Sequence, residues 1–123
     1  MSYRNLEIWQ LAKELVVDIH KMTLNELPKF EMYEEGSQIR RSIKSVKSNI
    51  VEGYGRRRYK AEFVRYLIFA HSSHDETLNQ LNMINQIYFQ DQPIQKLIEK
   101  YEILGRKLNS FIQYVEANWK IKT

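Results

Sequence analysis

The sequence predicts an all-α protein that folds as a single antiparallel, up-and-down four-helix bundle. Apolar residues recur at helical spacing in four segments, each long enough for several turns. The 123 residues include only four glycines and two prolines, so little interrupts these segments. Helices joined by short loops pack as antiparallel neighbours. A single helical hairpin is the alternative, but it would require more uniform heptads.

The expected helices form one domain, 1–123, and span residues 6–23, 37–53, 60–89 and 94–118. Asn5 is a suitable N-cap for the first helix. Gly53 or Gly55 can end the second in the left-handed conformation. Pro93 favours the first turn of the fourth helix, and Gly105 inside that helix is expected to permit close packing.

Several apolar residues fall outside the four core-facing stripes. Ile68, Phe69, Met83 and Ile87 lie off the main face of the third helix, and Ile103 lies off that of the fourth. A second apolar stripe along one helix is typical of a subunit interface, although chance exposure is the alternative. We therefore expect a homo-oligomer with Ile68, Phe69, Met83 and Ile87 at its interface.

The residue content offers little for catalysis. The absence of cysteine excludes disulfides, thiolate metal sites and a cysteine nucleophile, and it suits a reducing cytoplasm, where we expect the protein. No apolar run approaches the roughly 20 residues that span a membrane. The glycines at 53 and 55 end a helix, whereas phosphate-binding loops open one. We expect a protein that is not an enzyme and has no cofactor or membrane partner.

Three residues on the third helix have the spacing of metal ligands. His71, His74 and Asp75 stand at i, i+3 and i+4, so their side chains can converge. However, a helical ligand set normally draws partners from another helix, and no inward Glu-x-x-His pattern is present. Because His74 also falls on the core-facing arc, we expect a hydrogen-bonded core histidine and no metal.

Positive charge is concentrated between residues 37 and 66. This segment holds nine Lys and Arg residues against two Glu, a net charge of +7, whereas the rest of the chain is at −3. Mixed signs are usual on a solvated face, which is the alternative, so the imbalance indicates an anionic partner. The predicted nucleic-acid contacts are Arg40, Arg41, Lys44, Lys47, Arg56, Arg57, Arg58 and Lys60.

Two further interpretations concern neighbours of these basic residues. Tyr54 and Tyr59 flank the arginine cluster and can stack on unpaired bases. Arg41 can instead pair with Glu62 or another carboxylate.

The second helix carries a recognisable motif, SQIRRS at 37–42 followed by SNIVEGYGR at 48–56. It resembles the bacterial four-helix-bundle proteins encoded within intervening sequences of 23S ribosomal RNA genes. The opening YRNLEIW and the later runs EFVRYL and ETLNQL are similar to the same family, so the resemblance covers about residues 3–115. Family members commonly have a proline where this chain has Lys47, so we expect a straighter and more basic second helix.

The resemblance implies a subunit that assembles as a homopentamer and binds RNA, with no catalytic residue to transfer. Related accessory proteins act beside reverse transcriptases of diversity-generating retroelements, where a basic pentamer engages nucleic acid. We therefore expect a non-enzymatic, oligomeric nucleic-acid-binding protein, above all for RNA. The alternative is an oligomeric scaffold whose basic face binds an acidic protein partner.

Overall fold

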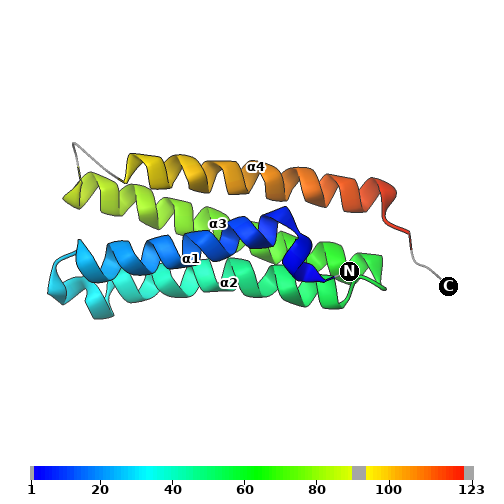
Figure 1. Ribbon diagram of the computed structural model, residues 1–123, viewed down its shortest axis with the longest axis horizontal. Coiled ribbons are helices and arrows are strands. Elements are labelled where there is room, and N and C mark those ends of the chain that lie inside the picture. The colour runs from blue at the N-terminus through cyan, green and yellow to red at the C-terminus, as the bar shows by residue number, and fades with distance from the viewer. Residues whose placement is uncertain (1, 90–93, 121–123) are drawn as a thin grey trace.

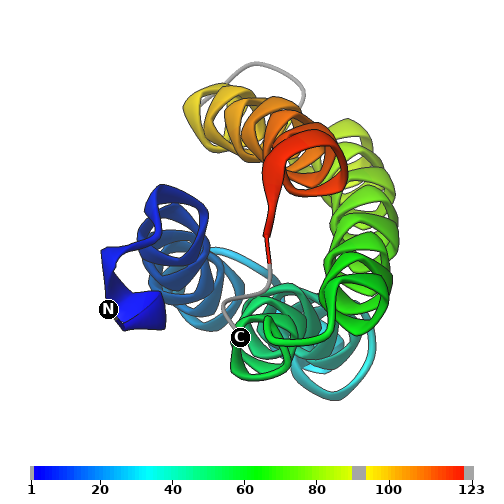
Figure 2. The same cartoon turned by 90° about the vertical axis from the view of Figure 1, so that its right-hand side faces the viewer.

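The protein is a four-helix bundle. The computed structural model describes residues 2–89 and 94–120. Its long helices are α1 (Glu7–Asn25), α2 (Glu35–Gly55), α3 (Lys60–Tyr88) and α4 (Gln95–Asn118), and two short 3-10 helices are η1 (Tyr3–Asn5) and η2 (Lys29–Tyr33). Successive long helices run in opposite directions (Figure 1) and surround a common centre (Figure 2). The predicted all-α, four-helix fold is confirmed, and the described residues include no strand.

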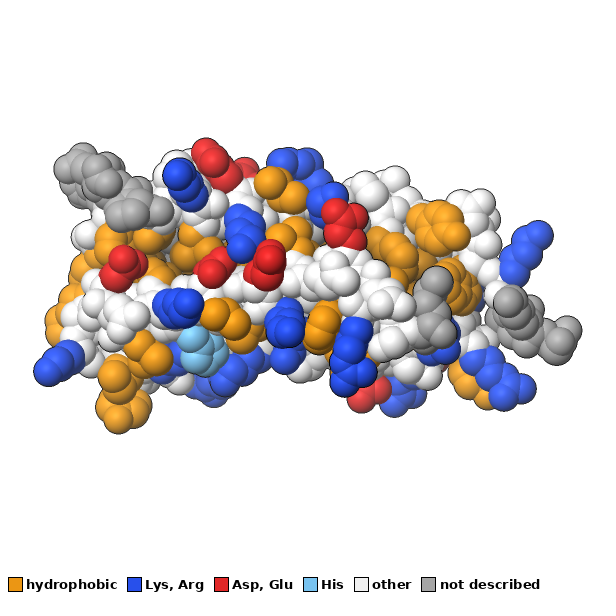
Figure 3. All heavy atoms as spheres, viewed as in Figure 1, with side chains coloured by type: hydrophobic (Ala, Val, Ile, Leu, Met, Phe, Trp, Pro, Cys, Tyr) orange, Lys and Arg blue, Asp and Glu red, His pale blue; other side chains and the backbone are white. Residues whose placement is uncertain are grey.

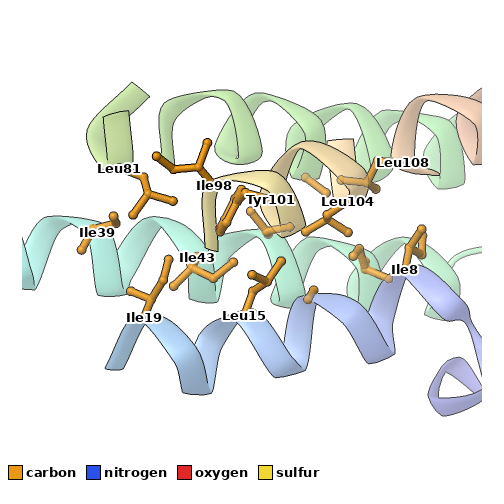
Figure 4. Close-up of a cluster of buried hydrophobic side chains, with 14 of the residues drawn as sticks. Ile8, Leu15, Ile19, Ile39, Ile43, Leu81, Ile98, Tyr101, Leu104 and Leu108 are labelled. Carbon is orange, nitrogen blue, oxygen red and sulfur yellow. The ribbon is translucent and has the colours of Figure 1, made fainter. Parts of the chain in front are cut away.

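The core lies where the predicted apolar stripes meet. Leu15 of α1, Ile43 of α2, and Tyr101 and Leu104 of α4 are fully buried and point toward one another (Figure 4). Phe63 of α3 fills the end of the core near the α2–α3 loop. There its ring packs edge-on against Trp119, and the two ring centroids are 5.0 Å apart. Each such side chain contributes roughly 1.5–3 kcal/mol on burial, so these layers hold the four helices together.

The predicted helix ends differ from the structure in their capping. Asn5 is not an N-cap, because it belongs to η1, where the Ser2 hydroxyl accepts a bond from the Arg4 amide. The expected left-handed glycine is also wrong, because no glycine in the described residues has a positive φ. Close packing against α3, and not backbone conformation, favours glycine at position 53, because a Cβ there would lie 3.3 Å from the Phe63 carbonyl oxygen. Pro93 lies outside the described residues.

Two part-buried hydrogen bonds fix η2, which the sequence did not predict. The Glu31 carboxylate accepts a 2.6 Å bond from the Tyr88 hydroxyl, and this bond raises the pKa of Tyr88 above its ordinary value. Arg40 donates to the Met32 carbonyl oxygen at 2.7 Å. Because Tyr88 belongs to α3 and Arg40 to α2, η2 is bonded to both helices.

A row of small polar side chains joins α2 to α3. The Thr77 hydroxyl donates to Ser42 at 2.8 Å, and Ser42 bonds Gln80 at 3.0 Å. One turn further along α2, the hydroxyls of Ser45 and Ser73 are 2.9 Å apart. Ser42 and Thr77 are buried, so these bonds satisfy polar groups that water does not reach. We call this row the polar seam.

Candidate nucleic-acid interface

Three of the predicted basic residues remain available along the outer side of α2. Arg41 and Lys44 are exposed and Lys47 is half-buried. Within the described part of the chain, no carboxylate lies within ion-pairing distance of any of them. Arg41 does not pair with Glu62, which instead contacts other arginines. At 1.5 Å per residue these cations span about 9 Å of the helix, and blue side chains follow α2 in Figure 3.

Arg40 has an internal role, although it stands beside Arg41 in the sequence. Its guanidinium donates to the Thr23 hydroxyl at 2.9 Å as well as to the Met32 carbonyl oxygen. These bonds tie α2 to the end of α1 and to η2. The Arg40 guanidinium therefore holds these elements together, and it is less available to a ligand than its neighbour Arg41.

Replacing Arg40 with Met should lower the free energy of unfolding by about 1–3 kcal/mol, because a buried hydroxyl and a carbonyl lose their donor. Urea denaturation measures this change. The matched control is Arg41→Met, which should leave stability nearly unchanged and weaken RNA binding instead. If Arg40→Met kept full stability and lost RNA binding, Arg40 would belong to the ligand surface.

The arginines after α2 are partly used by the protein itself. Arg56 pairs with Glu52 at 3.3 Å and with Glu62 at 3.6 Å, and the hydrogen bond that it donates to Glu52 raises the pKa of Arg56. Arg57 donates to the Tyr54 carbonyl oxygen at 3.0 Å, and its own carbonyl accepts a bond from the Trp119 indole. Both guanidinium groups also lie near the negative end of the α2 dipole, which favours cations even without a ligand.

The remaining cations of the loop and of the start of α3 have fewer partners within the protein. Arg58 is exposed and Lys60 half-buried, and no carboxylate in residues 2–89 or 94–120 pairs with either of them. Tyr59 is 60% exposed and can still offer a ring to a base. Tyr54 cannot, because it is buried and the Arg57 guanidinium covers its ring at 4.2 Å. The predicted stacking role is therefore wrong for Tyr54.

Sequence reasoning missed a group of cations stacked on aromatic rings. Lys13 lies over Trp9 at 5.5 Å and Arg65 over Phe69 at 5.3 Å. Both pairs are four residues apart on a helix, a spacing that brings side chains together and could have revealed them. They lie toward the same end of the bundle as the α2–α3 loop and the N-terminal residues (Figure 1). That end combines planar groups with positive charge.

The histidine cluster has a structural explanation. His74 is 3% exposed, and its Nε2 lies 2.6 Å from the Tyr101 carbonyl oxygen. Because a carbonyl only accepts, this nitrogen carries a proton and is not free for a metal. His71 and Asp75 are 3.5 Å apart on the surface. The predicted core histidine is confirmed, and Gly105 permits it, because the imidazole packs directly on Gly105.

The predicted second stripe is exposed. Ile68, Phe69, Met83 and Ile87 of α3 each leave 41–55% of their surface accessible, and Ile103 of α4 leaves 39%. Large apolar groups are therefore accessible along one face of α3. We call the four residues on α3 the outer stripe.

Comparison with known proteins identifies a family for this chain. The family described as 23S rRNA-intervening sequence protein matches residues 4–110. The chain belongs to this family. No curated protein matches the chain significantly. Among the described residues, no helix of this family member is long and apolar enough to cross a bilayer.

Proposed function

We propose that this 23S rRNA-intervening sequence protein is a non-enzymatic, oligomeric nucleic-acid-binding protein that acts on RNA in the cytoplasm. One observation carries the proposal. Within the described residues, cations without a carboxylate partner follow α2 and continue through the loop to the first residue of α3: Arg41, Lys44, Lys47, Arg58 and Lys60. Such a row matches a phosphate backbone better than a compact ligand. The family description, which names an rRNA context, supports RNA as the nucleic acid.

Assembly into an oligomer would allow phosphate contacts that are weak in one subunit to bind RNA together. A homo-oligomer, which the family resemblance suggests is a pentamer, repeats the basic row once per subunit. A long strand that touches several rows gains effective concentration at each further contact. Phosphate contacts position a nucleic acid but carry little sequence information. We therefore expect affinity for RNA with low sequence discrimination.

The salt dependence of RNA binding tests this proposal. If five cations contact phosphates, the logarithm of affinity for single-stranded RNA should fall with a slope of about −3.5, since each contact contributes about −0.7. Affinity should then drop roughly 100-fold between about 50 and 200 mM salt. Fluorescence anisotropy with labelled single-stranded and duplex RNA measures it. Absence of binding at the lowest salt, or binding that salt does not weaken, would overturn the proposal.

A scaffold for a protein partner is the second candidate. Phe30 and Tyr33 of η2 are 71% and 84% exposed, although Glu31 and Arg40 hold this element rigidly. Exposed aromatic side chains on a preorganised backbone are typical of protein–protein anchors. The scaffold function becomes the favoured proposal if RNA fails to bind at low salt.

A further inference from the structure

The C-terminal segment turns back over the end of the bundle where α2 passes into α3. Helix α4 ends at Asn118, and the backbone of Trp119 is extended, with its amide bonded to the Val115 carbonyl oxygen. The chain thus leaves the axis of α4 and crosses toward the loop between α2 and α3, as the red end of the ribbon shows in Figure 2. We call residues 56–59 of that loop the arginine loop. Trp119 lies outside residues 4–110, which the family matches.

Trp119 contacts the arginine loop and the core with different parts of its side chain. Its indole Nε1 donates a 2.9 Å hydrogen bond to the Arg57 carbonyl oxygen. Its ring packs edge-on against Phe63, and Phe63 in turn packs edge-on against Tyr54 with ring centroids 6.1 Å apart. The indole therefore joins the backbone of the loop to the aromatic end of the core.

The bond from Trp119 restrains a part of the loop that the loop's own bonds leave out. The Arg57 amide bonds the Tyr54 carbonyl oxygen at 3.1 Å, and the Tyr59 amide bonds that of Arg56 at 2.8 Å. The Arg57 guanidinium folds back over the Tyr54 ring. The Arg57 carbonyl oxygen takes no part in these contacts, and it accepts from Trp119 instead. A residue at the end of α4 thus fixes the middle of the arginine loop.

The two residues that follow Arg57 are the ones that this restraint presents to solvent. The Tyr59 carbonyl oxygen accepts a 2.9 Å bond from the Phe63 amide, so the backbone is held on both sides of Arg58. Both side chains are exposed, and the Arg58 guanidinium lies 6.0 Å from the centroid of the Tyr59 ring. A cation beside an exposed ring can contact the phosphate and the unpaired base of a single strand together. A loop that is ordered before binding loses less conformational entropy when it binds.

We propose that Trp119 is a positioning residue that preorganises the arginine loop for single-stranded RNA. This inference rests on the RNA binding of the proposed function, and it gives a role to a residue outside the family match. Trp119 acts through the Arg57 backbone and does not itself contact RNA. The contacts are made by Arg58, to phosphate, and by Tyr59, to an unpaired base.

Trp119→Phe tests the proposal, because phenylalanine keeps a ring against Phe63 and removes only the indole N–H. Affinity for a labelled single-stranded RNA should fall about 2- to 10-fold, since Arg58 and Tyr59 must then be ordered during binding. Fluorescence anisotropy measures affinity, and thermal denaturation checks that each variant is folded. The matched control is Trp9→Phe, because the Trp9 indole N–H has no hydrogen-bond partner among the described residues. This control should bind as the wild type does.

A double-mutant cycle separates positioning from a general loss of stability. When Arg58 and Tyr59 are both replaced by alanine, adding Trp119→Phe should change RNA affinity by less than about twofold, because the side chains that it positions are gone. In a Lys44→Ala background, which alters α2 and not the loop, the loss caused by Trp119→Phe should be the same as in the wild type.

The outcomes distinguish this inference from the proposed function. Equal effects of Trp119→Phe in both backgrounds would overturn the positioning role and leave RNA binding standing. Unchanged or tighter binding by Trp119→Phe alone would do the same. A wild-type protein that binds no RNA at low salt would remove the positioning role and the proposed function together.

Discussion

Reversing Lys44 and Lys47 to Glu is expected to lower the affinity for RNA on the order of 100-fold at low salt. Neither side chain has a carboxylate partner in the described residues, so both charges are available to phosphates. Removing two phosphate contacts should also make the salt slope less negative by about 1.4 for single strands. Because these contacts do not read bases, unrelated sequences should lose affinity by a similar factor. The bundle should stay folded, since neither residue belongs to its core.

Anisotropy titrations with two unrelated RNAs measure the effect, and circular dichroism checks the fold. The single variant Lys44→Glu should be compared with Lys29→Glu, which makes the same charge change at an exposed position on η2. Equal losses from both would mean that net charge, and not the row along α2, governs binding. Unchanged binding in the double variant would make the row a solvated face and favour the scaffold function.

Replacing Gly105 with Ala should destabilise the protein by up to about 2 kcal/mol, although Ala is the better helix former. A Cβ at this position would lie 2.9 Å from Nε2 of His74 and 3.2 Å from its Nδ1. The imidazole has little freedom to move, because it bonds the Tyr101 carbonyl oxygen and stacks on the Tyr101 ring at 5.1 Å. Overpacking of this kind costs about 1–3 kcal/mol, against a gain of about 1 kcal/mol in helix propensity, and a fixed imidazole places the cost toward the upper end.

Urea denaturation at fixed protein concentration compares the variants. Gly55→Ala is the matched control, because nothing lies within 4 Å of its added Cβ, and it should be neutral or slightly stabilising. In the His74→Ala background, Gly105→Ala should lower the free energy of unfolding by less than it does in the wild type, because the imidazole that clashes with the added Cβ is gone. If Gly105→Ala were as stable as the wild type, His74 would be able to move aside without cost.

The fold was predictable because it follows from long apolar stripes. Ile39, Ile43, Val46 and Ile50 repeat at helical spacing, and all four are fully buried as expected. The helix ends were less predictable, because they depend on single contacts that no periodicity encodes. The 3-10 helix η2 exists through bonds to Arg40 and to Tyr88, and the latter lies 57 positions from its partner Glu31.

The basic region was predictable as a charge imbalance. Which of its cations bond within the protein and which remain available was not predictable. Arg40 and Arg41 are adjacent, yet one points to Thr23 and Met32 while the other is exposed. A one-residue step turns a helix by about 100°, so adjacent side chains meet different surroundings. Which guanidinium is already occupied depends on carbonyls and carboxylates brought in from other elements. Composition cannot show that.

The polar seam between α2 and α3 fixes how the outer surfaces of these two helices are placed relative to each other. Sliding one helix by a turn, about 5.4 Å, would break the Thr77–Ser42, Ser42–Gln80 and Ser45–Ser73 bonds. Ser42 and Thr77 would keep only the bonds to carbonyls of their own helices, and each interhelical bond lost would cost about 0.5–1.5 kcal/mol. The seam therefore selects a single register between the two helices. The distance from the cations on α2 to the outer stripe on α3 is thus set by residues that belong to neither surface.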